Sequence, residues 1–511
     1  MNVGSGMIAK SLLLLLMWQM TVVSTSIAEG VMESKPVSSN KNDDKKNGGD
    51  GKGDKGSNIK NNDGKDDNVR IGRIPDTLSL ILDSTIVNNK DLKSQADEMR
   101  ATHEDIVVAK SAFRPHATFT AGRKLNNRTF HSRDKSVNPA VDATNKDRVT
   151  EYGIQIKQNL FRCGADKAAC SEVEHKIKAK WAACDAQVQQ VLRDTCISYF
   201  TIIAKQKEIS HLKALLRARK ESADVARRML QAGTAKELDV LQADASTSET
   251  ESKLAKAESE HTSYCAQFET MTGMRMPANP TIPTKMFDDD MPEDKAVALA
   301  TKHNPEVVAR GEECSAARET VRKINTEFYP SVDLTAGAEN SHDSSIKKFN
   351  DHDKKATTKT CFVSLGVTVP IYDGGSSRAE KRKAQAIVLK SKDERDKVVD
   401  TVKSEVRAVW AAIRAAKQNL ISAAKAVELR TLVLHDTMEE YKAGVKIMKD
   451  VLEAQSQLFE AQTLATQAEE QYFANQCRAI ALLGRMSPRH LKLRCNDVDF
   501  RAHYEQTRRR M

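Results

Sequence analysis

The sequence predicts an α+β fold in which pairs of strands alternate with very long helices, and the same order of elements occurs twice. Three observations support this prediction: an internal repeat, short segments with period-two alternation, and two segments without proline or glycine, 165–230 and 376–441. The composition agrees, because a chain of 511 residues with 5% aromatic and 29% charged residues is typical of long helices or coiled coils.

The internal repeat is defined by matched residues at two constant offsets in sequence number, 215 and then 211. With the first offset Asn89, Pro115 and Gly122 match Asn304, Pro330 and Gly337, and with the second Gly164, Tyr199, Gly233, Asp239 and Gly273 match Gly375, Trp410, Gly444, Asp450 and Gly484. A unit of this length is too long for a solenoid repeat. We therefore interpret residues 74–280 and 281–486 as two copies of one structural half, which differ in the length of one loop.

The N-terminus predicts export. Lys10 precedes the short apolar core 12–18, and Ser26-Ile27-Ala28 is a cleavage site of small residues, so residues 1–28 are interpreted as a signal peptide. A retained membrane anchor is the alternative. Because no other apolar run reaches the ~18 residues of a spanning helix, any membrane insertion is expected to use strands. Residues 29–73 are rich in Lys, Asp, Asn and Gly and are predicted to be disordered.

Each half contains two segments in which polar and apolar residues alternate, as in a strand with two different faces. The first segment of each half follows Pro115 or Pro330. The second is marked by Tyr152, Ile154, Ile156 and Leu160 in one half and by Val363, Leu365, Val367 and Ile371 in the other. The polar segments 124–149 and 339–358 are predicted to be loops. Four strands cannot close a membrane barrel, so either the sheet is soluble with one packed face or several chains pool their strands.

Each second strand leads into one of the two long helical segments, whose apolar residues recur at steps of three and four, as in coiled coils. The first helix is expected to end at Gly233 and the second at Gly444, because a left-handed glycine commonly closes a helix. A further helix then returns toward the sheet. Each half is therefore predicted to contain an antiparallel helical hairpin with this glycine at its tip.

Composition and motifs argue against several functions. The net charge is +10, but no basic segment is interleaved with stacking aromatics, so nucleic-acid binding is not expected. The sequence lacks H-E-x-x-H, G-x-S-x-G and a phosphate-binding glycine loop, so it does not predict an enzyme. Its His and Cys residues lack ligand spacing, so no metal or cofactor is expected. The cysteines are interpreted as packing thiols, with disulfides between helices left open, and residues 487–511 as a basic C-terminal tail.

Asn304-Pro305 is expected to open a helix, and residues 369–375 connect a predicted strand to a predicted helix. Tyr441–Gly444 is followed by Lys449–Ala454, which is the most specific of these segments. With these segments in this order, the sequence from about residue 74 to 485 resembles the TolC family of outer-membrane efflux channels. The first half departs more, since Lys90 stands where Pro305 stands in the second half. That departure lies at a helix start, far from the hairpin tips.

The resemblance implies a homotrimer in which four strands per chain form one 12-stranded transmembrane β-barrel, continuous with a long α-helical barrel in the periplasm. It implies an outer-membrane exit duct of a tripartite efflux pump or a type I secretion system, passing small molecules or proteins. The implied partners are a periplasmic adaptor protein, an inner-membrane pump or ABC transporter, and the lipid bilayer of the outer membrane. The alternative is an exported coiled-coil structural protein or adhesin without a pore.

The resemblance also places the functional residues at the hairpin tips. Asp450 and Glu453 lie three positions apart, so both can face one side of a helix, and a threefold axis would turn them into two acidic rings at the periplasmic entrance. A latch that holds this entrance shut is implied for Lys446 and Tyr441, in contact with Asp239 of the other hairpin. A lysine lacks the bidentate geometry of the arginine more usual at the position of Lys446.

Overall fold

The computed structural model describes residues 75–130, 143–234, 236–283, 285–287, 291–347, 354–494 and 500–509. The predicted signal peptide 1–28 and disordered segment 29–73 lie outside the described residues. Among the helices of the described ranges, none contains the long apolar stretch that a membrane-spanning helix requires.

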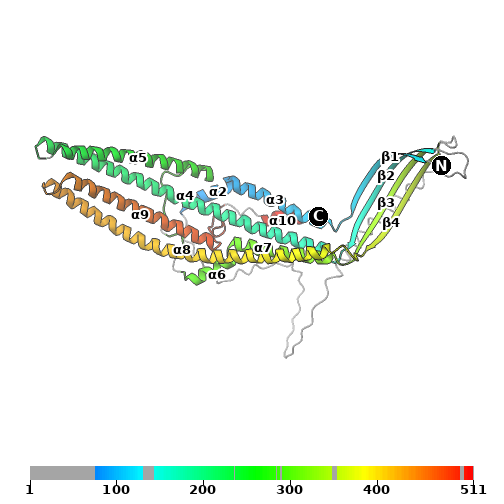
Figure 1. The fold of residues 1–511 in the computed structure, drawn as a ribbon. Helices are drawn as coiled ribbons and strands as arrows, with labels where there is room; N and C mark the ends of the chain where they lie inside the picture. The colour runs from blue at the N-terminus through cyan, green and yellow to red at the C-terminus, as the bar shows by residue number, and fades with distance from the viewer. Residues whose placement is uncertain are drawn as a thin grey trace, which may run out of the picture. The chain divides into compact units, whose positions relative to one another are not determined.

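The described residues form helices and strands that alternate along the chain (Figure 1). In chain order they are α2 (Asp76–Asn88), α3 (Lys90–Ser111), β1 (His116–Phe130), β2 (Ala143–Phe161), α4 (Ala165–Gln231), α5 (Glu237–Thr272), α6 (Glu293–His303), α7 (Pro305–Thr326), β3 (Ser331–Lys347), β4 (Lys354–Thr368), α8 (Ser376–Lys442), α9 (Met448–Leu482) and α10 (Phe500–Arg509).

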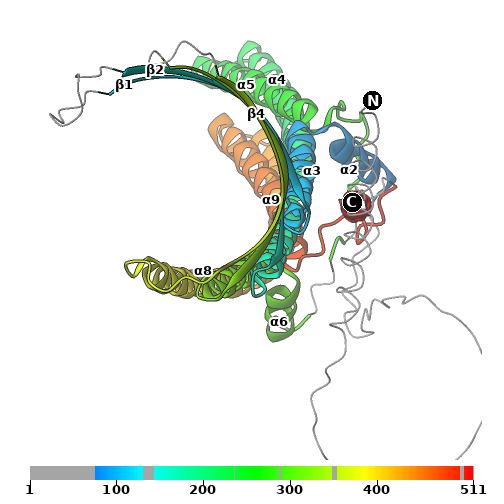
Figure 2. The same ribbon diagram turned by 90° about the vertical axis from the view of Figure 1, so that its right-hand side faces the viewer.

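The four strands form one antiparallel sheet in the order β1-β2-β3-β4, which Figure 2 shows as a curved arc. The strands are longer than the sequence predicted, and much of the predicted loops 124–149 and 339–358 is strand. That prediction was wrong because polarity was taken to end a strand, whereas the backbone ladder continues wherever a neighbouring strand supplies partners. Residues 131–142 and 348–353 of those loops lie outside the described residues.

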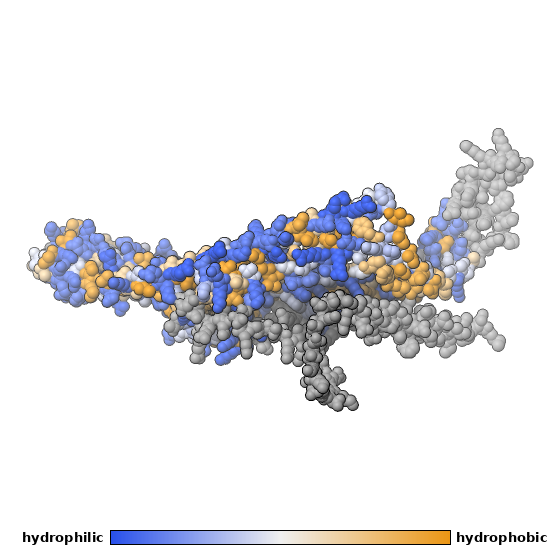
Figure 3. Space-filling view, turned by 90° about the horizontal axis from the view of Figure 1, so that it is seen from below, coloured by the Kyte–Doolittle hydropathy of each residue, from blue (hydrophilic) through white to orange (hydrophobic). Residues whose placement is uncertain are grey.

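One set of alternating apolar side chains on the sheet is exposed rather than packed. Leu365 and Val367 on β4 are 63% and 62% exposed, and Phe119 on β1 and Ile154 on β2 are 68% and 54% exposed. In the view of Figure 3 hydrophobic residues gather where the strands leave the helices, and hydrophilic ones lie farther along the strands. The described chain therefore provides no packed face for a soluble sheet.

The two long helices α4 and α8 each have 67 residues, within one residue of the predicted ends. At a rise of ~1.5 Å per residue each is about 100 Å long. Helix α5 packs along α4, and α9 packs along α8, which gives two antiparallel hairpins (Figure 1). Helix α4 also contacts α9 and α7, so the two hairpins lie against each other.

The largest core cluster lies where the long helices pass the segment that joins the two halves. Tyr199 of α4 donates a hydrogen bond from its hydroxyl to the carbonyl of Thr281 (3.0 Å). Trp410 of α8 donates from Nε1 to the carbonyl of Met291 (3.0 Å), and its ring meets Phe287 edge-on. The two aromatic residues that match each other in the internal repeat thus both hold this connecting segment.

The segment predicted as a basic tail contains a docked helix in its described part. Helix α10 packs on α3. The ring of the buried Tyr504 meets the rings of Trp181 and His103, with ring centroids 5.3 Å and 5.5 Å apart. Thr507 on the same helix is also buried. The interpretation as a tail rested on charge alone and missed that these two residues, three positions apart, share one helix face.

Candidate functional site at the hairpin tips

The structure places Gly233 and Gly444 at the ends of α4 and α8, in the turns that form the hairpin tips. Their φ angles of 72° and 77° lie in the left-handed region. The next amide in each turn bonds back to the helix, from Thr234 to the carbonyl of Met229 and from Val445 to that of Glu440, both at 2.9 Å. A Cβ at either glycine would meet nothing within 4 Å, so backbone conformation alone favours glycine here.

Asp239 and Asp450 occupy the same position in the two hairpins, in the first turns of α5 and α9. The carboxylate of Asp239 accepts a hydrogen bond from the amide of Lys236 (3.2 Å), and that of Asp450 accepts from the amide of Ile447 (3.3 Å). A carboxylate here is also stabilised by the positive end of the helix dipole. Both residues therefore have a structural role as helix caps, which the spacing of an acidic residue three positions after the residue that precedes the helix could have indicated.

Glu453 lies one turn beyond Asp450 on α9 and is exposed. Its carboxylate accepts a hydrogen bond from Nε2 of Gln457 (3.3 Å) within the same helix. The half-buried Asp450 and the exposed Glu453 are thus held by groups at the start of α9, and neither forms an ion pair within the described part of the chain.

The predicted latch residues do not all come together in one chain. Nζ of Lys446 pairs with Oε2 of Glu440 (2.7 Å) in its own hairpin, and this hydrogen bond raises the pKa of Lys446 above its ordinary value. Tyr441 is buried, and its hydroxyl has no hydrogen-bond partner in the described chain. Burial, and then the charge of nearby Asp239, raise the pKa of Tyr441. Asp239 therefore acts on Tyr441 through its charge without a hydrogen bond between them, whereas Lys446 pairs with Glu440.

Sequence reasoning missed the apolar cluster behind Tyr441. The ring packs with small and apolar side chains of both hairpins: Ala223, Ala226, Ala243, Met448 and Val451. Alanines at this density allow the helices to approach closely. The tips are therefore joined by packing, to which the predicted charged latch would be an addition.

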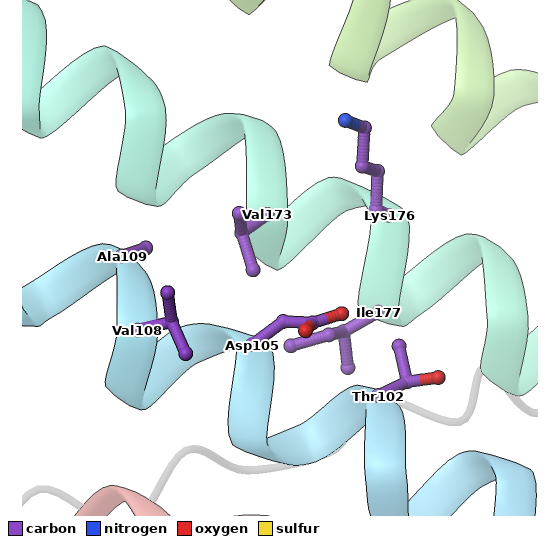
Figure 4. A pocket seen from close by; sticks show the side chains of 7 residues that line it. All are labelled: Thr102, Asp105, Val108, Ala109, Val173, Lys176 and Ile177. Carbon is purple, nitrogen blue, oxygen red and sulfur yellow. The ribbon is translucent and has the colours of Figure 1, made fainter.

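The described chain has a further pocket away from the tips, with a volume of about 300 Å³, between α3 and α4 (Figure 4). Its lining is mostly apolar, and in Figure 4 Lys176 points away from Asp105. Lys176 instead pairs with Glu172 (2.6 Å). Because no polar groups converge there, and no group of three His, Cys, Asp or Glu able to hold a metal occurs among the described residues, the tips are the better candidate site.

Paired helical hairpins of this length, joined to a curved sheet with an exposed apolar face, define the class of outer-membrane channel proteins. A sequence model described as outer membrane efflux protein matches residues 81–274 and 296–485. The chain therefore belongs to the outer membrane efflux protein family. The predicted family, channel function and outer-membrane location are thereby confirmed, in preference to a structural protein without a pore.

Individual relatives agree with this assignment. The outer membrane efflux protein BepC of Brucella suis is 24% identical over 432 residues, which cover 84% of this chain and 90% of BepC. The proteases secretion protein PrtF of Dickeya chrysanthemi is 23% identical over 399 residues, 75% of this chain and 82% of PrtF. The solved structure of CusC has a TM-score of 0.70 at 16% identity and covers 81% of this chain and 94% of that chain, which supports the fold.

Proposed function

We propose that three copies of this chain form one exit duct, in which four strands per copy close a 12-stranded barrel and the helices line a periplasmic tunnel. The observation that carries this proposal is a sheet whose outer strands, β1 and β4, each pair with one strand only among those described. Open edges are not viable in lipid unless neighbouring copies close the barrel, and the exposed apolar face would then contact the lipid.

We further propose that residues 74–280 and 281–486 are two copies of one half, because the hairpins share one register. In β1·β2 His116 pairs with Lys157, and in β3·β4 Ser331 pairs with Thr368, which are the same positions after shifts of 215 and 211 in sequence number. If β4 pairs with β1 of the next copy in the same register in which β2 pairs with β3, the residue pairs between the two copies can be derived. The pair Thr150–His342 then maps to Cys361 (150 + 211) opposite Asn127 of the next copy (342 − 215).

This register predicts a specific cross-link. Cross-strand neighbours have Cβ atoms about 4.5–5.5 Å apart, close to what a disulfide needs. Asn127→Cys is therefore expected to form an intermolecular disulfide with the native Cys361 and to give covalent dimers and trimers on non-reducing gels. The bands should disappear with reductant and in the Cys361→Ser background.

Two matched variants serve as controls for the register. Asn126→Cys places the thiol on the opposite face of the same strand, and Leu125→Cys moves it two positions along the strand. Both are expected to cross-link much less than Asn127→Cys. Cross-linking that favours Leu125→Cys would show a different register, and monomers from all three membrane-inserted variants would rule out the shared barrel.

The proposed partners are a periplasmic adaptor and an inner-membrane pump or ABC transporter, which would dock at the hairpin tips. Exposed apolar residues near both tips support a docking surface there, with Leu238 and Leu241 on α5 and Val445 and Ile447 beside the second turn. Among the relatives BepC is named for efflux and PrtF for protease secretion, so both small molecules and proteins are compatible cargo. Cross-linking in cells followed by co-purification would identify the adaptor and pump.

The proposed acidic rings lead to a prediction for channel block. Combining Asp450→Asn with Glu453→Gln is expected to abolish the block of single-channel current by trivalent cations in planar bilayers, because the rings lose their charge. Asparagine keeps an oxygen that can cap α9, so the fold should be retained. Asp239→Asn, which changes the equivalent cap on α5, is the matched control and should leave the block intact. Persistent block in the double variant would exclude these rings as the cation site.

A further inference from the structure

A buried arginine lies between the two helical hairpins, away from their tips. Arg219 of α4 is 5% exposed. Its Nη1 donates hydrogen bonds to the carbonyl of Ser246 and to Oγ1 of Thr250 on α5, both at 2.6 Å. Its Nη2 donates to Oγ of Ser456 on α9 at 2.8 Å. One guanidinium therefore bonds to the helix of its own hairpin and to a helix of the other hairpin.

No carboxylate forms an ion pair with Arg219 in the described chain, and its Nε has no hydrogen-bond partner there. Burial lowers the pKa of Arg219, while the charge of Glu249 on α5 acts in the opposite direction. A buried charge is costly unless its donors are satisfied, and a broken bond leaves that cost in place. Because the bond to Ser456 crosses to the other hairpin, movement of α9 away from α4 would remove a partner from this cation.

A second polar contact lies one turn closer to the tips. Nε2 of Gln455 on α9 donates to Oγ of Ser222 on α4 (2.9 Å), and both residues are almost completely buried. Lys446, a cation at the tips, pairs within its own hairpin. Arg219, in contrast, donates to both hairpins, and Gln455 with Ser222 adds a neutral contact between α4 and α9.

We propose that Arg219, with the Ser222–Gln455 pair, is an intramolecular tie just behind the tips that limits how far the two hairpins separate there and so sets the resting width of the periplasmic entrance. This inference rests on the proposed function, since it concerns the same tunnel. It differs from the predicted latch in its position, on α4 and α9 behind the tips, and in its chemistry, a buried guanidinium bound by neutral oxygens.

The chain contains a matched control for this proposal. Arg430 on α8 is the counterpart of Arg219 in the internal repeat, but it is exposed and its Nη1 donates to Oε1 of Gln457 within its own hairpin. Arg219→Leu is expected to raise the resting single-channel conductance several-fold in planar bilayers. Arg430→Leu removes the same residue type without touching the tie and should leave the conductance unchanged. Leucine fills most of the buried volume, so Arg219→Leu is expected to assemble.

A reversible clamp makes the test independent of that variant. The double substitution Ser222→Cys and Gln455→Cys places two thiols where side-chain atoms now lie 2.9 Å apart. Oxidation is expected to return the Arg219→Leu channel to the wild-type conductance, and reductant should release it. If Arg219→Leu fails to assemble, the clamp in the otherwise native chain should block opening when oxidised.

Two results would overturn the tie: assembled Arg219→Leu channels with wild-type conductance, or an oxidised clamp that has no effect on opening. Failure of the proposed function has a different signature, because the native chain itself would then form no trimer and conduct no current.

Discussion

Replacing Gly484 with alanine is expected to prevent accumulation of the folded channel, whereas the same change at Gly444 is expected to be tolerated. Both glycines are left-handed, with φ of 71° and 77°. At Gly484 a Cβ would lie 2.3 Å from the carbonyl oxygen of His303 and 2.8 Å from its carbonyl carbon, whereas at Gly444 it would meet nothing within 4 Å. The two variants share the backbone strain and differ in the clash.

The clash at Gly484 is severe because backbone atoms cannot rotate out of the way. Asn304 next to this contact donates from Nδ2 to the carbonyl of Leu482 (3.2 Å), and its side chain also caps α7 by accepting from the amide of Glu306 (2.9 Å). Displacing α9 would therefore disturb the start of α7 as well. Left-handed strain alone costs about 1–2 kcal/mol for alanine, and the combined loss is expected to exceed ~4 kcal/mol.

Heat-dependent gel migration of the assembled channel, together with its outer-membrane level, measures the effect. Gly273→Ala is an informative intermediate, since a Cβ there would lie 2.8 Å from Cβ of Asn88, a smaller overlap than the one with the carbonyl oxygen of His303. The expected order of damage is Gly484→Ala, then Gly273→Ala, then Gly444→Ala. Equal accumulation of the first and last variants would show that the close approach to His303 does not constrain α9.

Gly444 and Gly484 also show what a single sequence could and could not predict. Gly233 and Gly444 follow long proline-free helices, so local pattern was enough to place the helix ends and the tips. Gly484 was recognised as a matched position of the internal repeat. A glycine is needed there because of the carbonyl of His303, which belongs to a distant element of the chain. A pattern within a short stretch of sequence identifies a helix or a strand. Whether a position must lack a side chain depends on a second element that packs against it.

The residues of the candidate site also differ in whether the sequence alone could identify them. The acidic residues at the starts of α5 and α9 were placed at the tips through the family resemblance, and their role as helix caps became clear only from their bonds to Lys236 and Ile447. Arg219 gave no signal, because an arginine inside a charged helix resembles any solvated residue. Only the packing of α4 against both α5 and α9 distinguishes it. The docking of α10 was likewise hidden, since the helix it packs on, α3, lies in the other half of the chain.

Acid is expected to release helix α10 from α3, through His103. His103 is fully buried, and its Nε2 lies 2.9 Å from Nε1 of Trp181, while its Nδ1 lies 2.9 Å from Nδ1 of His503. An indole N–H can only donate, so Nε2 of His103 must be the acceptor and Nδ1 carries the proton. His503 then accepts through its own Nδ1. The contact therefore requires both imidazoles to be neutral.

The direction of the pH effect follows from this arrangement. Burial, and then the charge of His503, lower the pKa of His103 from 6.5 to about 4. The groups that face it from the packed helices are Trp181 of α4 and His503 and Tyr504 of α10, and none is a carboxylate. A lowered pKa on a base means that docking is fully stable above 6.5 and loses stability as the pH falls toward about 4. The loss is about 1.4 kcal/mol per pH unit.

Hydrogen exchange of residues 500–509 in the assembled channel, compared between neutral pH and a pH about two units lower, measures this release. The native chain is expected to lose protection in α10 in acid, while α4 and α9 keep theirs. His103→Gln retains a side chain able to accept from Trp181, and combining it with His503→Gln removes both imidazoles of the pair, so α10 in this double variant should be protected equally at both pH values. Equal loss of protection in the two proteins would assign the release to other groups, and full protection of the native α10 in acid would show that the histidine pair does not control docking. Protonation of His103 would break the bond from Trp181 and leave a charge buried under α10, whereas release of α10 exposes the ring to water, so a fall in pH toward about 4 acts on a whole helix.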